Sequence, residues 1–252
     1  MDKNSLINYE KLAGFDKKMF YKKETFPFAS FYELLTPKSF QQLISNFPDI
    51  EKFKKNENLA RKYNQRPHNR YYLSYKKSTE ISDNLPGFIK HQELSKSWQQ
   101  FIDELESKQY QQFIKQILGV STFNVKYVWH IGINGSEVSP HCDVEDKLGT
   151  HIFYFNTSQD WQEEWGGATV ILDQKQISAL NPDFSDFKTK IPIPFLDNHS
   201  FLFKNAPEFW HGVERLSCPE GKHRRIFSVI FESASLSKVI KKKLSWLLHK
   251  TT

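Results

Sequence analysis

The tripeptide His141-Cys142-Asp143 carries side chains that could hold a divalent metal ion. In an extended segment, residues two apart project to the same face, so His141 and Asp143 could bind one cation together while Cys142 points the other way. A third ligand must come from a distant strand, and His211 in the segment PEFWHGVERL is the natural candidate. Two imidazoles and a carboxylate form a facial triad, which leaves three positions of an octahedral Fe(II) ion open. Open positions are needed if a co-substrate and dioxygen must both reach the metal.

An isolated His-x-Asp pair is common on protein surfaces, so the metal hypothesis depends on the elements that would bring these residues together. From about Ser121 to Ser233 the chain has short runs rich in β-branched and aromatic residues, namely VKYVWHI, THIFYFN, GATVIL, SFLFKN and RRIFSVIF. Turn residues such as Asn134-Gly135 and Gly166-Gly167 separate these runs. Several short strands with turn signals between them predict a β-sandwich or barrel.

The sequence on either side of this region has helical patterns. Thr36 followed by Pro37 has the types expected at an N-cap and a first helical position. Apolar residues at helical spacing predict further helices around Trp98–Leu105 and Phe113–Leu118, and another over Leu236–His249. The polar stretch 52–69 has no clear period, and it predicts a loop or an exposed helix.

Composition bounds the class of protein. A chain of 252 residues suits one large domain. The net charge of +6 is compatible with nucleic acid, anionic lipid or an acidic small substrate, but apart from Lys241–Lys243 it is not concentrated in one tract, so we interpret it as a solvated surface. Two cysteines, Cys142 and Cys218, cannot make a disulfide framework. The polar N-terminus and the lack of an apolar run of roughly 18 residues predict a cytoplasmic protein without a transmembrane segment.

The order of features along the chain resembles that of the Fe(II)/2-oxoglutarate-dependent dioxygenases, in particular the prolyl-4-hydroxylase-like branch. His141 is followed by THIFYFN, then Gly166-Gly167, then a strand with His211, and then Arg225 at the start of another strand. The resemblance implies an α+β fold with a double-stranded β-helix, or jelly-roll, core. We therefore expect a single domain over residues 1–252, with a mainly helical N-terminal part at 1–120 packed on the core, a catalytic core at 121–235 and a C-terminal helix at 236–252.

The same resemblance implies roles for residues beyond the triad. It predicts that Fe(II) and 2-oxoglutarate bind, that dioxygen is consumed and that ascorbate acts as a possible reductant. A basic residue on the strand after His211 would hold the distal carboxylate of 2-oxoglutarate. Arg225 is expected to do so rather than Arg224, because it shares a strand face with Phe227, Val229 and Phe231. The residues expected to complete the co-substrate site are Tyr154, Thr150, Ile152 and His130.

The substrate is less well defined by the sequence. Asp143 argues for hydroxylation, since halogenating relatives have a small residue at this position. A small molecule or saccharide is the preferred substrate class, a peptide prolyl residue is an alternative, and nucleic acid is disfavoured because no basic-aromatic recognition stretch is present. The segment containing Arg66, Arg70 and Tyr72 could cover the mouth of the site.

Two hypotheses of other classes stay open at the level of sequence. One is a non-catalytic jelly-roll binding protein, and the other is a zinc hydrolase with Glu145 as its general base. Neither explains an arginine and a tyrosine placed beyond the triad. The basic tail could pack on the barrel or lie on an anionic membrane, and the oligomeric state is not indicated.

Overall fold

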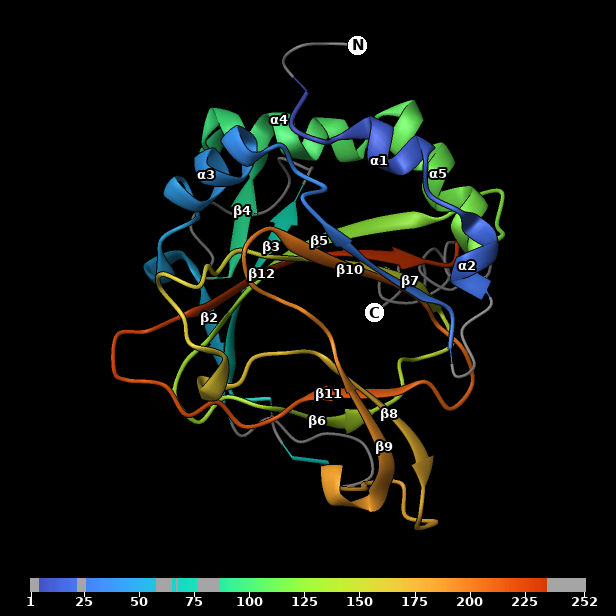
Figure 1. Cartoon of the computed structure of the whole chain (residues 1–252). Helices are drawn as coiled ribbons and strands as arrows, with labels where there is room; N and C mark the ends of the chain where they lie inside the picture. The colour runs from blue at the N-terminus through green and yellow to red at the C-terminus, as the bar shows by residue number, and fades with distance from the viewer. Residues whose placement is uncertain (1–4, 22–25, 58–64, 67, 77–86, 235–252) are drawn as a thin grey trace, which may run out of the picture.

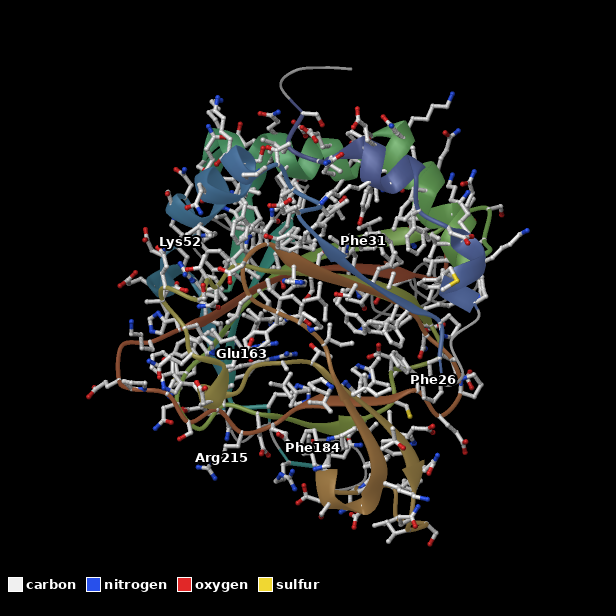
Figure 2. All side chains as sticks on the ribbon, in the orientation of Figure 1. Phe26, Phe31, Lys52, Glu163, Phe184 and Arg215 are labelled. Carbon is white, nitrogen blue, oxygen red and sulfur yellow. The ribbon has the colours of Figure 1, made fainter. Side chains whose placement is uncertain are left out.

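The computed structural model describes residues 5–21, 26–57, 65–66, 68–76 and 87–234. Two β-sheets face each other, and a layer of helices covers the outer face of the larger sheet (Figure 1). Side chains fill both the space between the two sheets and the space between the larger sheet and the helices (Figure 2). This is the jelly-roll, double-stranded β-helix architecture expected from the sequence.

The larger sheet has eight strands, in the order β1-β10-β7-β12-β5-β3-β2, with β4 paired to β3. Every pairing in it is antiparallel except that of β3 with β4. The strands are β1 (Phe28–Tyr32), β2 (Lys54–Asn56), β3 (Arg70–Lys76), β4 (Phe88–Lys90), β5 (Asn124–Gly132), β7 (Lys147–Tyr154), β10 (His199–Lys204) and β12 (Arg224–Glu232).

The smaller sheet has four antiparallel strands in the order β6-β11-β8-β9. These strands are β6 (Val138–His141), β8 (Val170–Lys175), β9 (Phe187–Pro192) and β11 (Trp210–Val213). His141 on β6 and His211 on β11 are direct partners across the ladder. The pairing of these two strands therefore brings together residues that are 70 positions apart in the sequence.

The helices are α1 (Tyr9–Ala13), α2 (Lys17–Tyr21), α3 (Pro37–Ser45), α4 (Lys96–Leu105) and α5 (Lys108–Leu118). Thr36 caps α3 as its residue type suggests, since its hydroxyl accepts a hydrogen bond from the Ser39 amide at 3.2 Å. On α4, Trp98 and Phe101 are fully buried against the larger sheet, where the Trp98 ring lies 5.1 Å from that of Phe227. The helix layer therefore takes up the apolar outer face of this sheet.

The two faces of β12 have different neighbours, and this difference decides which residues can enter the site. Phe227, Val229 and Phe231 belong to the core shared with the helices. The alternate residues point the other way, toward the smaller sheet, and they are Arg224, Ile226, Ser228 and Ile230. The larger apolar side chains therefore mark the helix-covered face, while smaller and polar ones face the space between the sheets.

The N-terminal part is less helical than the sequence suggests. Residues before 120 contribute four strands, β1 to β4, to the larger sheet, and β2 falls in the stretch expected to be a loop or exposed helix. The reason is tertiary: β1 and β3 pair with β10 and β5, whose edges would otherwise have unpaired backbone groups. The helix expected at 236–252 lies outside the described residues. Within the described ranges, no helix has both the length and the apolar character needed to span a membrane.

Candidate metal centre and co-substrate pocket

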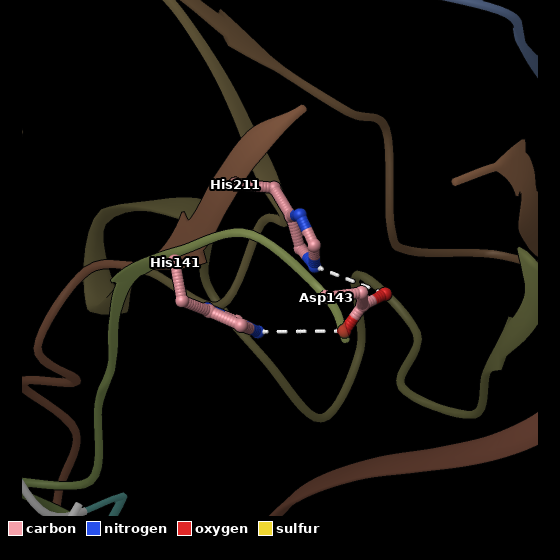
Figure 3. Close-up of side chains that lie close together, drawn as sticks. All are labelled: His141, Asp143 and His211. Carbon is pink, nitrogen blue, oxygen red and sulfur yellow. Dashed lines mark ion pairs between the residues drawn. The ribbon is translucent and has the colours of Figure 1, made fainter. Parts of the chain in front are cut away.

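His141, Asp143 and His211 lie close together (Figure 3), with the two histidines on neighbouring strands of the smaller sheet. Their candidate ligand atoms all lie within 4.8 Å of one another. His141 Nε2 is 3.9 Å from Asp143 Oδ1, and His211 Nε2 is 3.9 Å from Asp143 Oδ2. These separations leave room for one cation between the three side chains, because metal–ligand bonds of about 2 Å place two ligands 3–4 Å apart.

Both imidazoles are held in the tautomer that a metal ligand needs. His141 Nδ1 lies 3.0 Å from the carbonyl oxygen of Ser139, and His211 Nδ1 lies 3.1 Å from that of Phe209. A carbonyl oxygen can only accept, so each Nδ1 carries the proton and donates it. Each Nε2 therefore presents a lone pair toward Asp143.

The charge states of the triad also suit a cation. Burial, and then the neighbouring His211 and Lys147, lower the pKa of His141 well below its usual value. Burial also lowers the pKa of His211. Burial alone would raise the pKa of Asp143, but the Lys147 ammonium and the two histidines outweigh it and lower that pKa to about 2. At neutral pH the site therefore offers two neutral imidazoles and one carboxylate.

A pocket of about 100 Å³ extends from the triad between the sheets. Its walls come from β5, β7 and β12 of the larger sheet and from β6 and β11 of the smaller one. Thr150 and Ile152 line it, as strand alternation suggests. His141, His211 and Lys147 lie on its wall together with Arg224 and Arg70. The pocket thus connects the candidate metal ligands to a set of cationic side chains.

Arg224 is buried at this pocket, with 6% of its surface exposed. Its Nε donates a hydrogen bond to the Gly167 carbonyl oxygen at 2.6 Å. Gly167 has φ +112°, and a Cβ there would come within 3.1 Å of the Arg224 side chain, so a glycine is needed both for the turn and for this approach. Burial lowers the pKa of Arg224 to about 10, which still leaves the guanidinium charged at neutral pH.

Tyr154 lies beside Arg224, whose guanidinium carbon is 5.8 Å from the tyrosine ring centroid. The Tyr154 hydroxyl donates to Thr169 Oγ1 at 2.7 Å, and burial raises the pKa of the phenol to about 12. Three buried polar atoms at the pocket have no hydrogen-bond partner among the described residues: Arg224 Nη2, Thr150 Oγ1 and His130 Nδ1. Buried polar groups are normally paired, so these atoms indicate a place for a polar ligand.

Residues 125–232 match the model of the 2OG-Fe(II) oxygenase superfamily. The matched segment contains the strands of the candidate site, so this part of the chain is similar to a 2OG-Fe(II) oxygenase domain. The family implies Fe(II) and 2-oxoglutarate, and the residues gathered at the pocket fit both. No curated protein matches the sequence.

Solved structures with a similar fold include two prolyl hydroxylases and a protein of Streptomyces solved with iron. A prolyl-4-hydroxylase of Pseudomonas putida is 13% identical with a TM-score of 0.56, and the match covers 88% of this chain and 98% of that one. A prolyl hydroxylase of Trichoplax adhaerens, solved with a peptide fragment of hypoxia inducible factor, is 14% identical with a TM-score of 0.57, over 89% and 90%. HygX of Streptomyces hygroscopicus, solved with iron bound, is 9% identical with a TM-score of 0.54, over 87% of each chain. At such identities these likenesses show the fold alone.

The two neighbouring arginines of β12 do not lie as the sequence predicts. Arg224, and not Arg225, enters the pocket. Arg225 does share a face with Phe227, Val229 and Phe231, but that face lies against the helices. The Arg225 guanidinium forms an ion pair with Asp160, and its amide donates to Asn156 Oδ1 at 2.7 Å. The run of large apolar residues on β12 predicts the barrel interior, whereas in the structure it lies on the helix-covered outer face of the larger sheet.

Two other histidines have very different surroundings. His130 lines the pocket, where burial and then the charges of Arg70, Arg224 and Lys147 lower its pKa well below the usual value. A neutral imidazole therefore faces the pocket. His151 faces away, toward the helices, and its Nδ1 and Nε2 hydrogen-bond with the hydroxyls of Tyr110 and Ser200.

The three residues expected to cover the mouth separate in the structure. Arg70 lines the pocket. Arg66 forms ion pairs with Glu137 and Asp183, and Tyr72 lies against Gly87. Two other residues of this segment lie against the smaller sheet: the His68 ring is 5.7 Å from that of His141, and the Asn69 carbonyl accepts a hydrogen bond from Ser136 Oγ at 2.6 Å, just before β6. Two further residues at the site were not predicted. Lys147 contacts Asp143 and Thr169 contacts Tyr154, and nothing in the sequence marks either residue except its distance along the chain from its partner.

Proposed function

We propose that this oxygenase hydroxylates a C–H bond of a small molecule or saccharide, with His141, Asp143 and His211 as the Fe(II) ligands. The observation that carries the proposal is the pocket that joins this triad to a buried arginine with an unused Nη2. A zinc hydrolase or a jelly-roll binding protein would have no need of that arginine beside a facial triad.

Arg224 is the residue that would bind the distal carboxylate of 2-oxoglutarate. One side of its guanidinium is fixed by the Gly167 carbonyl, so Nη2 is held in place to donate to a carboxylate oxygen. Thr150 Oγ1 is a second buried hydroxyl without a partner among the described residues, and it could donate to the same group. Tyr154 keeps its proton, which it donates to Thr169, and its ring packs beside Arg224 without adding charge.

Bound iron, 2-oxoglutarate and dioxygen would together supply the oxidising chemistry, with succinate and CO2 as the other products. The protein's part is to orient the co-substrate and to keep water and competing reactants away from the metal. His141 and His211 supply fixed lone pairs, and Asp143 supplies the anionic ligand whose presence favours hydroxylation over halogenation. Neutral His130 could donate or accept at the end of the pocket without repelling a metal ion.

The substrate class is proposed from the space around the metal. The pocket has a volume of about 100 Å³, and the His68 ring lies 5.7 Å from that of His141, beside the triad. This arrangement favours a compact substrate over a folded protein. A peptide prolyl residue is the alternative, since it too could enter as a single side chain.

The test is turnover of 2-oxoglutarate to succinate by purified protein with Fe(II) and ascorbate, measured with and without a metabolite extract. We expect slow turnover alone, faster turnover with extract, and a product heavier by one oxygen atom. His211→Ala should abolish both activity and iron binding, while His199→Ala, which changes a histidine away from the pocket, should not. Absence of turnover with either extract or a prolyl-peptide panel would reject the proposed activity, and stoichiometric iron in His211→Ala would reject that ligand.

A further inference from the structure

The three proposed metal ligands are held in different ways. His141 and His211 are each anchored through Nδ1 to a backbone carbonyl two residues earlier. Asp143 lies in the irregular segment just after β6. Among the described residues, the ion pair that Asp143 forms outside the triad is with Lys147, whose Nζ lies 2.8 Å from Oδ2, although the angles of this contact are not those of a hydrogen bond. The carboxylate is therefore oriented by a side chain rather than by the backbone.

Lys147 is itself well fixed. It begins β7 after a tight turn in which its amide donates to the Val144 carbonyl oxygen at 3.0 Å. Its ammonium lies 5.8 Å from the centroid of the Phe203 ring, which limits where the side chain can swing. The side chains of Lys147 and Asp143 are only 18% and 9% exposed, so water competes little for this ion pair.

We propose that Lys147 is a positioning residue that holds Oδ2 of Asp143, so that the carboxylate binds the metal through Oδ1 alone. The proposal rests on the metal site proposed above. The terminal torsion of an aspartate is broad, so an unrestrained carboxylate could turn and offer both oxygens. With Oδ2 engaged by Lys147, Asp143 occupies one coordination position, and the remaining positions stay open for co-substrate and dioxygen.

Orientation and charge make opposite predictions for the loss of Lys147. Removal of a cation beside the metal lowers repulsion, which by itself would tighten metal binding. Loss of a residue that orients a metal ligand without binding the metal itself weakens metal binding, commonly by about 10–100-fold. The sign of the change in affinity therefore tells the two roles apart.

The experiment measures Co(II) binding to the full chain by isothermal titration calorimetry, together with the visible absorption of the bound ion. We expect Lys147→Met to weaken Co(II) binding roughly 10–100-fold. We also expect it to change the Co(II) absorption, because the coordination number changes when Asp143 turns. Lys147→Arg, which keeps a charged donor, should restore most of both. Lys126→Met is the matched control, since Lys126 forms a 2.6 Å ion pair with Glu232 on the exposed sheet surface.

Each result has a defined meaning. Equal or tighter Co(II) binding by Lys147→Met, with an unchanged spectrum, would overturn the positioning role while leaving the metal site intact. Failure of the wild-type chain to bind Co(II) would overturn the metal site itself, and this role with it. Thermal melting of the metal-free variants shows whether they are folded. If Lys147→Met does not fold, Lys147→Gln, whose side chain is one bond shorter, takes its place with the same expected loss.

Discussion

Arg224 and Arg225 are neighbours in sequence but lie on opposite faces of β12. The Arg224 side chain passes close to Gly167, where a Cβ would crowd it, and lines the pocket. Arg225 forms an ion pair with Asp160. Both are cations on the strand after His211, so residue type does not separate them. Their surroundings do, because only Arg224 has a buried N–H without a partner in the described part of the chain.

Replacement of Arg224 by alanine should therefore raise the 2-oxoglutarate concentration needed for half-saturation. Hydrogen bonds to charged groups contribute about 1.5–3 kcal/mol, so we expect a change of roughly 10- to 100-fold. Titration of the Co(II)-loaded protein with 2-oxoglutarate measures the dissociation constant directly. Arg225→Ala is the control and should change that constant little. The reverse ranking of the two variants would show that Arg225 is the carboxylate ligand.

How well single residues could be predicted depended on local rules. The spacing of His141 and Asp143 predicts that both face one site, because side chains two residues apart in an extended chain share a face, although Asp143 lies just beyond β6. The partner strand that brings His211 opposite His141 is non-local, and it was supplied by the family resemblance. The choice between Arg224 and Arg225 needed knowledge of which sheet face the helices cover, and no local pattern carries that information.

At the scale of elements, β7 and β10 approach so closely that one position admits only glycine. A Cβ at Gly149 would lie 2.4 Å from the Phe203 carbonyl oxygen and 2.9 Å from Leu118. The first of these is backbone in a paired strand, so it cannot move without disturbing the ladder. β7 carries Lys147 and Thr150 on either side of this glycine, which ties the site to the same close contact.

Gly149→Ala should therefore destabilise the fold by about 1–3 kcal/mol, the usual cost of overpacking. We expect a lower midpoint in urea unfolding and weaker Co(II) binding, because β7 shifts away from β10. Gly14→Ala is the control: its Cβ would meet only the Glu10 carbonyl oxygen, at 3.3 Å. An unchanged urea midpoint for Gly149→Ala would mean that the two strands separate at little cost.

The elements themselves could be predicted unevenly. Helices α3, α4 and α5 follow from capping residues and apolar spacing, which are local. Strands β2, β6 and β11 are three or four residues long, too short to show an alternating pattern. They exist because neighbouring strands supply their hydrogen bonds, and a chain read alone does not show its neighbours.

For the molecule as a whole, the burial of neutral histidines between layers links stability to pH. His151 is enclosed between α5 and the larger sheet, and burial lowers its pKa to about 3. Burial also lowers the pKa values of His130, His141 and His211. In the unfolded chain a histidine takes up its proton near pH 6.5. Between that pH and about 3, the unfolded state thus binds the extra proton and is favoured as the pH falls.

Each such histidine should lower the free energy of unfolding by about 1.4 kcal/mol per pH unit below roughly pH 6.5. His151→Gln should remove one proton's worth of this slope between about pH 6 and pH 4, whatever its effect at neutral pH. Urea unfolding of both proteins across this range, with a chelator present so that metal binding adds no protons, gives the two slopes. Parallel curves would show that His151 takes up its proton in the folded protein, and so that the helix layer opens above pH 4. A shallower curve for His151→Gln would show that the helices and the larger sheet stay packed over the whole range.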